Sequence, residues 1–212
     1  MSDLSPGRHD ITWTETQAPG AEYNPRMRAT TADLARAVLI AALSLPLGAC
    51  SLPYVPPFTS PPPAAVAHPA DSAGRVVGNA VFLQDGGSVR ILLDVFGVAP
   101  GSKAVHIHEV GECAAPSFES AGAHFNPDKK QHGTGNPRGP HAGDLPNIFV
   151  EATGKGHLEF TAKRVTLKKG AHSLLDGKGT ALVLHADPDD MRTDPDGDSK
   201  GRVACGVIVR AQ

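Results

Sequence analysis

The fold is decided by residues 75–110, which read RVVGNAVFLQDGGSVRILLDVFGVAPGSKAVHIHEV. Two runs rich in valine, isoleucine and leucine, 76–83 and 89–95, stand on either side of the Asp-Gly-Gly sequence at 85–87. Asp-Gly between two such runs is typical of a β-hairpin turn. A third run of the same kind follows at 104–110 after a Pro-Gly turn. The stretch therefore predicts three short strands joined by tight turns.

The rest of the domain continues this pattern. Further strands are predicted at 148–151, 157–162, 181–186 and 203–210, with a single helical turn within 167–175. Many short strands separated by turns, together with 23 glycines and 19 prolines, favour an all-β antiparallel sandwich or barrel. A net charge of −2 gives no basis for nucleic-acid binding. One segment, 111–147, lacks strand signals, and loops of this length in a small domain are usually functional.

The residues before the β domain have the composition of a targeting segment. Residues 27–49 contain arginines, a short apolar run and Leu-Gly-Ala directly before Cys50, as expected of a signal peptide. The apolar run is shorter than the ~20 residues that a membrane-spanning helix needs. Leu-Gly-Ala-Cys resembles the lipobox of bacterial lipoproteins, which implies a lipidated Cys50 and a protein anchored to a membrane of the cell envelope, in the periplasm. Plain secretion, an uncleaved anchor and a buried core helix are the alternatives.

The chain is therefore divided into four parts. Residues 1–26 show no apolar pattern and are interpreted as a mis-called extension before a true start at Met27. Residues 27–49 are the lipoprotein signal peptide, and the proline-rich residues 50–72 form an extended, semi-stiff tether. The remaining residues, 73–212, form the functional domain.

Histidines and one aspartate in the domain have the spacing of metal ligands. His106 and His108 are two residues apart in a predicted strand, so their side chains share one face. The long loop supplies three more histidines and a carboxylate, which together form a plausible tetrahedral zinc set: His124, His132, His141 and Asp144. His185 ends another predicted strand. The pattern predicts a two-metal site, to which His9, His68, His157 and His172 do not belong.

Five motifs extend this pattern to a known family. They are AVHIHEVGEC at 104–113, SAGAHFNPDKKQHG at 120–133, HAGDLPN at 141–147, LVLHADPDDM at 182–191 and GRVACGVIV at 201–209. In this order they resemble copper/zinc superoxide dismutases of the bacterial periplasmic type. The resemblance implies an eight-stranded antiparallel Greek-key barrel, an immunoglobulin-like sandwich, with the metals under two long loops. It also implies an oxidoreductase that dismutates superoxide to oxygen and hydrogen peroxide and protects the cell envelope.

The resemblance further assigns roles to individual residues. It assigns copper to His106, His108, His124 and His185, and zinc to His124, His132, His141 and Asp144. It makes His124 a shared, catalytic bridge between the metals and Arg202 the catalytic arginine that guides the anion. It makes Asp189 the carboxylate that links a copper histidine to a zinc histidine, and it pairs Cys113 with Cys205 in a disulfide.

The residue types fit that chemistry independently. Four imidazoles suit Cu(II), whereas three imidazoles and a carboxylate suit Zn(II). Two functions of another kind remain as alternatives, a non-catalytic copper or zinc store and a zinc-only structural domain. The sequence leaves both a monomer and a homodimer open.

Overall fold

A hairpin forms the centre of the larger of two sheets in the computed structural model, which describes residues 64–212. Strands β3 (Gly78–Asp85) and β4 (Ser88–Val95) pair antiparallel from Gly78↔Val95 to Asp85↔Ser88. The two-residue turn between them is Gly86-Gly87, and Gly86 has a φ of 55°, which glycine adopts without steric cost. The turn signal in the sequence thus sets the register of the longest strand pair.

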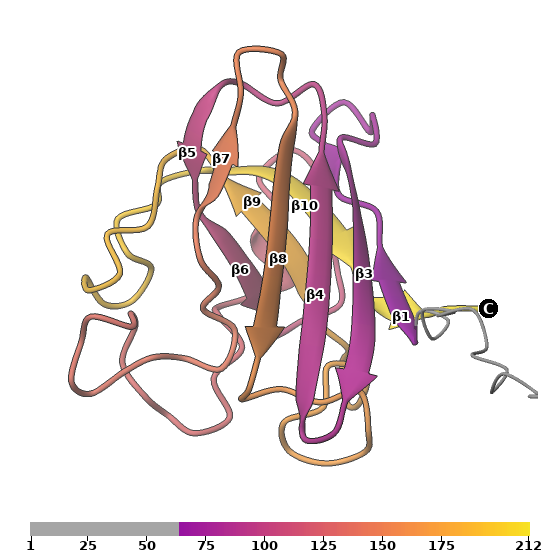
Figure 1. Cartoon of the computed structure of the whole chain (residues 1–212), viewed down its shortest axis with the longest axis vertical. Helices are drawn as coiled ribbons and strands as arrows, with labels where there is room; N and C mark the ends of the chain where they lie inside the picture. Colours follow the sequence, from indigo (N-terminus) through magenta and orange to yellow (C-terminus); the bar gives the residue numbers. More distant parts are fainter. Residues whose placement is uncertain (1–63) are drawn as a thin grey trace, which may run out of the picture. The chain divides into compact units, whose positions relative to one another are not determined.

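The strands form two antiparallel sheets that face one another (Figure 1). The larger has the order β11-β1-β3-β4-β8-β7-β5, and the smaller has the order β2-β10-β9-β6. The remaining strands are β1 (Ala65–Ala67), β2 (Ala70–Asp71), β5 (Gly101–Lys103), β6 (Val105–His108), β7 (Ile148–Val150), β8 (Gly156–Ala162), β9 (Ala181–His185), β10 (Arg202–Val207) and β11 (Val209–Arg210).

Three stretches of chain pass from one sheet to the other and make the corners of the sandwich. β1 continues into β2, β5 into β6, and β10 into β11, each after a break of one or two residues. When each of these pairs is taken as one strand, the described chain contains the eight strands that were predicted. Strands that switch sheets at a bend are the usual way in which two β-layers are joined. Each hydrogen-bonded sheet is open by itself, and the all-β, antiparallel fold class is confirmed.

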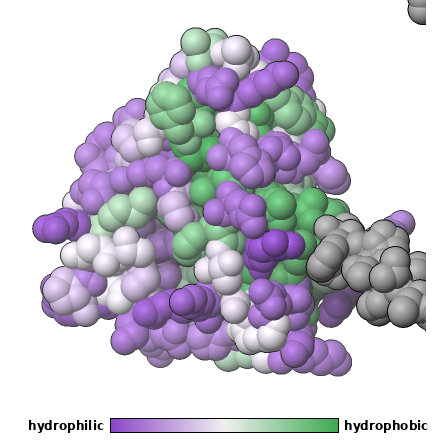
Figure 2. Space-filling view, in the orientation of Figure 1, coloured by the Kyte–Doolittle hydropathy of each residue, from purple (hydrophilic) through white to green (hydrophobic). Residues whose placement is uncertain are grey.

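Aliphatic side chains fill the space between the sheets. The largest fully buried ones come from both layers and from the loops: Phe82, Ile91, Leu93, Ile107, Ile148, Leu174 and Leu182. Along β4 the burial alternates, because successive side chains of a strand point to opposite faces. Figure 2 shows the outer face of the larger sheet, where hydrophilic side chains cover much of the surface between smaller hydrophobic areas.

The structure differs from the sequence prediction at two places. The sandwich begins at Ala65, within the segment interpreted as tether, because β1 pairs with β3 and β11 while β2 pairs with β10. Pro69 is accommodated because it lies in the break between β1 and β2. The predicted helical turn at 167–175 is wrong. The one helical turn of the described chain is the 3-10 helix η1 (Glu119–Ala121) in the long loop.

The N-terminal predictions concern residues outside this range. The extension 1–26, the signal peptide 27–49, Cys50 and the tether up to residue 63 all lie before the described residues. Among residues 64–212, no helix has the length and apolar character needed to cross a membrane.

The disulfide between Cys113 and Cys205 is present. It joins the long loop after β6 to β10 across 92 residues of sequence, with a Cα–Cα distance of 5.6 Å. Closing a loop of this size removes chain entropy from the unfolded state and stabilises the fold by on the order of 4–5 kcal/mol in the chain-entropy account. The cross-link therefore fastens one end of the long loop to the strand that carries Arg202.

Candidate metal centre

Strand β6 lies at the centre of the site, and the long loop is hydrogen-bonded to its free edge. All four residues of β6 are buried, and its other edge pairs with β9 from Val105↔Leu184 to His108↔Ala181. On the free edge, Ile107 donates to Gly143 O and accepts from Phe125 N. A Cβ at Gly143 would lie 2.3 Å from Ile107 O, so only glycine allows this approach. These contacts bring the loop histidines beside the strand histidines.

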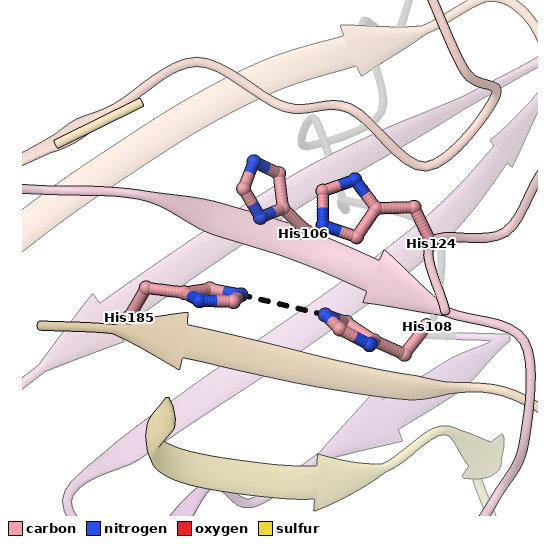
Figure 3. Close-up of side chains that lie close together, drawn as sticks. All are labelled: His106, His108, His124 and His185. Atoms are coloured by element: carbon pink, nitrogen blue, oxygen red, sulfur yellow. Dashed lines mark hydrogen bonds between the residues drawn. The ribbon is translucent and has the colours of Figure 1, made fainter. Parts of the chain in front are cut away.

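Four buried histidines form the first cluster, and Figure 3 shows their rings facing a common space. They are His106, His108, His124 and His185, and each offers a ring nitrogen within 4.8 Å of the others. His108 Nε2 and His185 Nε2 lie 3.4 Å apart. Nitrogen atoms that converge in this way can act as ligands of one cation.

Backbone carbonyls set the tautomers of this cluster. His108 Nδ1 donates to Gly122 O at 2.9 Å, and His185 Nδ1 donates to Lys200 O at 3.2 Å. A carbonyl oxygen can only accept, so the proton of each ring is on Nδ1 and the lone pair is on Nε2. His106 has the opposite tautomer, since its Nε2 donates to Asp189 Oδ2 at 2.9 Å. The free lone pairs are those that point toward the other rings.

A second cluster surrounds the carboxylate of Asp144. The Nδ1 atoms of His124, His132 and His141 lie 3.1, 3.1 and 3.2 Å from Asp144 Oδ1. The other oxygen, Oδ2, accepts from the backbone N–H groups of Gly133 and His141, both at 2.9 Å. The structure thus brings the four residues of the predicted zinc set together. His106 also comes within ligand distance of this group, but its Nε2 is already bonded to Asp189.

Unpartnered buried nitrogens indicate that both clusters are built for cations. His106 Nδ1, His124 Nε2 and His132 Nδ1 are inaccessible to solvent and have no hydrogen-bond partner among the described residues. Buried polar atoms are nearly always paired, so three orphans within one cluster of rings need an explanation. Metal ions that accept these lone pairs provide it, and the donor set of nitrogens with one carboxylate fits copper and zinc.

Asp189 connects the two clusters by a hydrogen bond to one ring of each. Its Oδ2 accepts from His106 Nε2, and its Oδ1 accepts from His132 Nε2, each at 2.9 Å. Two hydrogen bonds to Asn147 fix its backbone, at 2.8 Å to the side-chain oxygen and 2.9 Å from the side-chain nitrogen. A Cβ at Gly197 would lie 2.0 Å from Asp189 Oδ1, so a glycine is required there. One carboxylate therefore fixes one ring of each cluster.

Burial keeps the first cluster neutral. It lowers the pKa of His106 to about 3, of His108 to about 2 and of His185 to about 4. Burial also lowers the pKa of His124. For His132, burial is outweighed by the two nearby carboxylates of Asp144 and Asp189, which raise the pKa to about 10. At neutral pH the first cluster therefore presents lone pairs that a cation can bind without displacing protons.

These shifts predict how the stability of the metal-free protein depends on pH. Below a pH of about 6.5, His106, His108 and His185 become protonated in the unfolded chain but stay neutral in the folded protein. The free energy of unfolding therefore falls toward pH 4. The contribution of His132, whose folded pKa is raised, is complete below 6.5 and is lost as the pH rises toward 10. We expect the free energy of unfolding of chelator-treated protein, measured in urea, to be highest near pH 6.5–7. A profile that stays flat from pH 7 to 4 would contradict this.

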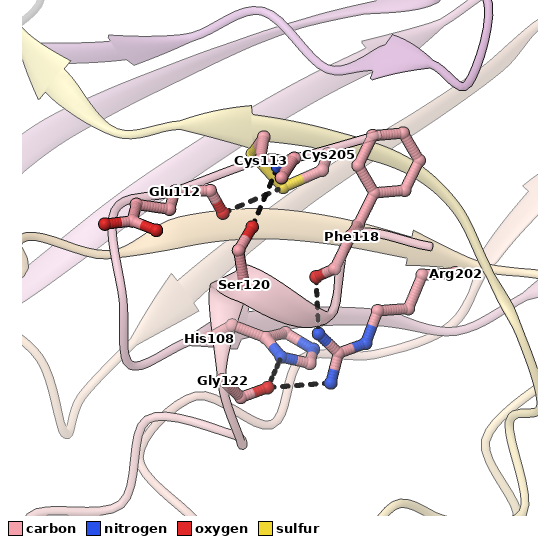
Figure 4. The surroundings of a disulfide bond; sticks show 9 residues. His108, Glu112, Cys113, Phe118, Ser120, Gly122, Arg202 and Cys205 are labelled. Carbon is pink, nitrogen blue, oxygen red and sulfur yellow. Dashed lines mark hydrogen bonds between the residues drawn. A yellow bond between two sulfur atoms is a disulfide. The ribbon is translucent and has the colours of Figure 1, made fainter. Parts of the chain in front are cut away.

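Arg202 lies against the first cluster, as Figure 4 shows. Its guanidinium donates to Phe118 O at 2.6 Å and to Gly122 O at 2.7 Å. Gly122 O also accepts from His108 Nδ1, so the arginine and a histidine of the cluster share one carbonyl. Phe118 and Gly122 flank the short helix η1, in the loop that the disulfide fastens to β10. The positive charge is therefore held in a fixed position beside the rings.

Several residues that contribute to the site carry no signal in the sequence. Asn147 stands within the motif HAGDLPN, but nothing in an asparagine before a strand indicates that it holds Asp189. The carbonyls of Phe118, Gly122 and Lys200 act through the backbone, which residue type does not reveal. Three of the histidines predicted to be outside the pattern do lie apart from it, since His68 bonds to Asn79, His157 pairs with Asp94 and His172 pairs with Asp128, all at the surface. His9 lies outside the described residues.

Comparison with known proteins identifies this arrangement. A family model described as copper/zinc superoxide dismutase (SODC) matches residues 76–208. Superoxide dismutase [Cu-Zn] 2 of Aquifex aeolicus is 47% identical over 140 residues, which cover 65% of this chain and 82% of that protein. Superoxide dismutase [Cu-Zn] of Caulobacter vibrioides is 42% identical over 138 residues, which cover 64% and 79%.

A solved structure gives the same result for the fold. The crystal structure of a SOD-like protein from Bacillus subtilis superposes with a TM-score of 0.66 at 38% identity, and the match covers 68% of this chain and 97% of that one. The match to the family model spans more than half of the chain and includes every histidine of both clusters. The chain belongs to the copper/zinc superoxide dismutase family.

Proposed function

We propose that the four-histidine cluster holds copper, that the cluster around Asp144 holds zinc, and that His124 bridges the two. The family's reaction is the dismutation of superoxide to oxygen and hydrogen peroxide, with copper and zinc as cofactors. The observation that carries the residue assignment is the position of His124. Its Nδ1 faces Asp144, while its Nε2 is buried and unpartnered on the side of the other three rings.

The residues of the site have different roles in the reaction. Bound copper supplies the one-electron redox chemistry, which zinc cannot supply. His108 and His185 each keep one proton on Nδ1 and present Nε2, and Asp189 fixes the rings of His106 and His132. The reaction consumes two protons for each pair of superoxide ions. His124 Nε2 is placed to take up one of them and to pass it to the product.

The assignment is tested by measuring metal content and activity together. Full-length protein loaded with copper and zinc should inhibit the reduction of cytochrome c by superoxide, while protein loaded with zinc alone should not. Copper bound tightly without activity would instead favour a metal store, and the absence of copper binding would favour a zinc-only structural domain.

We expect Arg202→Ile to slow the enzyme without changing its copper spectrum. The guanidinium is always charged and offers a fork of donors to a small anion, while the metal-binding nitrogens belong to other residues. Arg202 is partly buried, and steering by a charge that solvent still reaches weakens as salt screens it. The variant should therefore be several-fold slower at low ionic strength and should show a flatter dependence of rate on salt.

The measurement is a series of rates against ionic strength at fixed pH for both proteins. Arg210→Ile, at the exposed strand β11, is the control for loss of one positive charge. Equal rates and equal slopes for Arg202→Ile and the wild type would show that another residue guides the anion.

We also propose that the protein is a lipoprotein of the cell envelope. The support is the sequence before the domain, where the apolar run of residues 27–49 ends in Leu-Gly-Ala before Cys50. Lipid attached at Cys50 and a tether of proline-rich residues would place the enzyme in the periplasm beside a membrane. Metabolic labelling with a fatty acid should mark the wild type and not Cys50→Ser. A Cys50→Ser variant that still carries the fatty-acid label would show that Cys50 is not the site of lipidation.

A further inference from the structure

Ser199 has a buried hydroxyl group beside the four-histidine cluster. This hydroxyl has no role in the proposed reaction. The residue is fully buried, with 0% of its surface exposed. Its Oγ lies 3.1 Å from Nδ1 of His185, and this is its one hydrogen-bond partner within residues 64–212. A fully buried hydroxyl whose hydrogen-bond partner is a ring of the four-histidine cluster can influence that ring directly.

The backbone around Ser199 is built to hold it there. Two hydrogen bonds continue the pairing of β9 and β10 into the loop, from Ala186 N to Gly201 O at 2.8 Å and from Asp187 N to Ser199 O at 3.1 Å. The residues on either side, Asp198 and Lys200, have φ values of 56° and 63°. These left-handed conformations are uncommon for residues other than glycine, and the surrounding contacts must maintain them.

The geometry of His185 defines what the hydroxyl does. Nδ1 donates to Lys200 O at 3.2 Å, and Ser199 Oγ at 3.1 Å is a second acceptor for the same N–H. Shared hydrogen bonds of this kind are common in proteins. Two acceptors on Nδ1 fix the orientation of the ring and increase the basicity of Nε2, the nitrogen that faces His108.

We propose that Ser199 is a positioning residue for His185, which it orients and makes a stronger donor to copper. The proposal rests on the proposed function, in which His185 Nε2 is a copper ligand. A more basic nitrogen favours Cu(II) over Cu(I), so the hydroxyl stabilises the oxidised site. Loss of the hydroxyl should weaken Cu(II) binding and raise the reduction potential of the site.

The test compares copper binding in full-length, zinc-loaded variants. Ser199→Ala should bind Cu(II) about 10-fold more weakly in competition with a chelator, since removing a partner of a metal ligand typically costs 10–100-fold and Lys200 O remains. Ser199→Thr and Ser199→Val have side chains of the same shape, and only the first keeps a hydroxyl. Ser199→Thr should therefore bind copper more tightly than Ser199→Val and keep the wild-type electron paramagnetic resonance spectrum.

Two further variants separate the possible failures. Ser173→Ala removes another buried hydroxyl, whose hydrogen-bond partner is Leu175 N and not a histidine of either cluster, and it should leave copper affinity unchanged. His185→Ala should lose Cu(II) affinity. A His185→Ala variant that keeps this affinity would overturn the proposed function itself. When His185→Ala does lose it, equal Cu(II) affinities for wild type and Ser199→Ala would overturn the role of Ser199. Parallel loss of zinc and copper in Ser199→Ala would also overturn this role. So would equal Cu(II) affinities for Ser199→Thr and Ser199→Val.

Discussion

His185→Ala is expected to have no measurable dismutase activity while its β-sandwich remains folded. The side chain ends β9, is buried, and supplies one of the four converging nitrogens. Alanine removes that nitrogen, while the other three histidines stay in place because each has its own hydrogen-bond partner. Zinc binding should persist, because none of the nitrogens around Asp144 comes from His185.

The measurements are activity, copper and zinc content, and the circular dichroism spectrum. His157→Ala is the matched control, because His157 is an exposed histidine of β8 that pairs with Asp94 away from the site. The control should keep full activity and both metals. Turnover by His185→Ala at a rate comparable to the wild type would remove His185 from the copper assignment.

Asp144→Ala is expected to lose zinc and much of the stability of the long loop. The carboxylate lies within 3.2 Å of three Nδ1 atoms and accepts two backbone hydrogen bonds, from Gly133 and His141. Burial opposes its ionisation, but the three histidine rings around it and the backbone N–H groups hold its pKa far below the usual range. Removing one partner of a buried charged group costs about 3–5 kcal/mol, so the melting temperature should fall by on the order of 10 °C.

Zinc titration separates the loss of a ligand from general damage. A metal that binds only the native state raises the melting temperature, so zinc should raise it for metal-free wild type and barely for Asp144→Ala. Asp128→Ala, a carboxylate of the same loop at the surface beside His172, should respond as the wild type does. Activity should be reduced but not abolished, since the copper nitrogens remain. Wild-type zinc affinity in Asp144→Ala would contradict the assignment.

Most of the strands could be predicted because their signals are local. The hairpin of β3 and β4 follows from two aliphatic runs around Gly86-Gly87, and its register follows from that turn. The first strand has no such signal. It is short, rich in alanine and interrupted at Pro69, and it is a strand only because β3 and β10 provide partners for its backbone. Tertiary pairing of this kind cannot be read from composition.

The sequence was sufficient to predict which residues form the site, but not which atom of each residue binds a metal or carries a proton. Imidazoles and carboxylates are rare enough in such spacing to reveal a metal site, and the structure brings those residues together. Which nitrogen carries the proton depends on the carbonyls of Gly122 and Lys200 and on Asp189, which approach from other parts of the chain. Ser199 and Asn147 escaped notice for the same reason, since their roles come from where the backbone places them.

The neighbouring positions of the first and last strands affect when the protein can fold. β1 pairs with β11 through Ala65↔Arg210, and β2 pairs with β10 through Cys205↔Ala70. Pairing between residues so far apart in sequence is slow, and here it also cannot occur until the ribosome has synthesised β10 and β11. His185 and the second disulfide cysteine come late in the chain as well. The nascent polypeptide therefore has neither a complete sandwich nor a complete metal site until residues 202–210 have been synthesised.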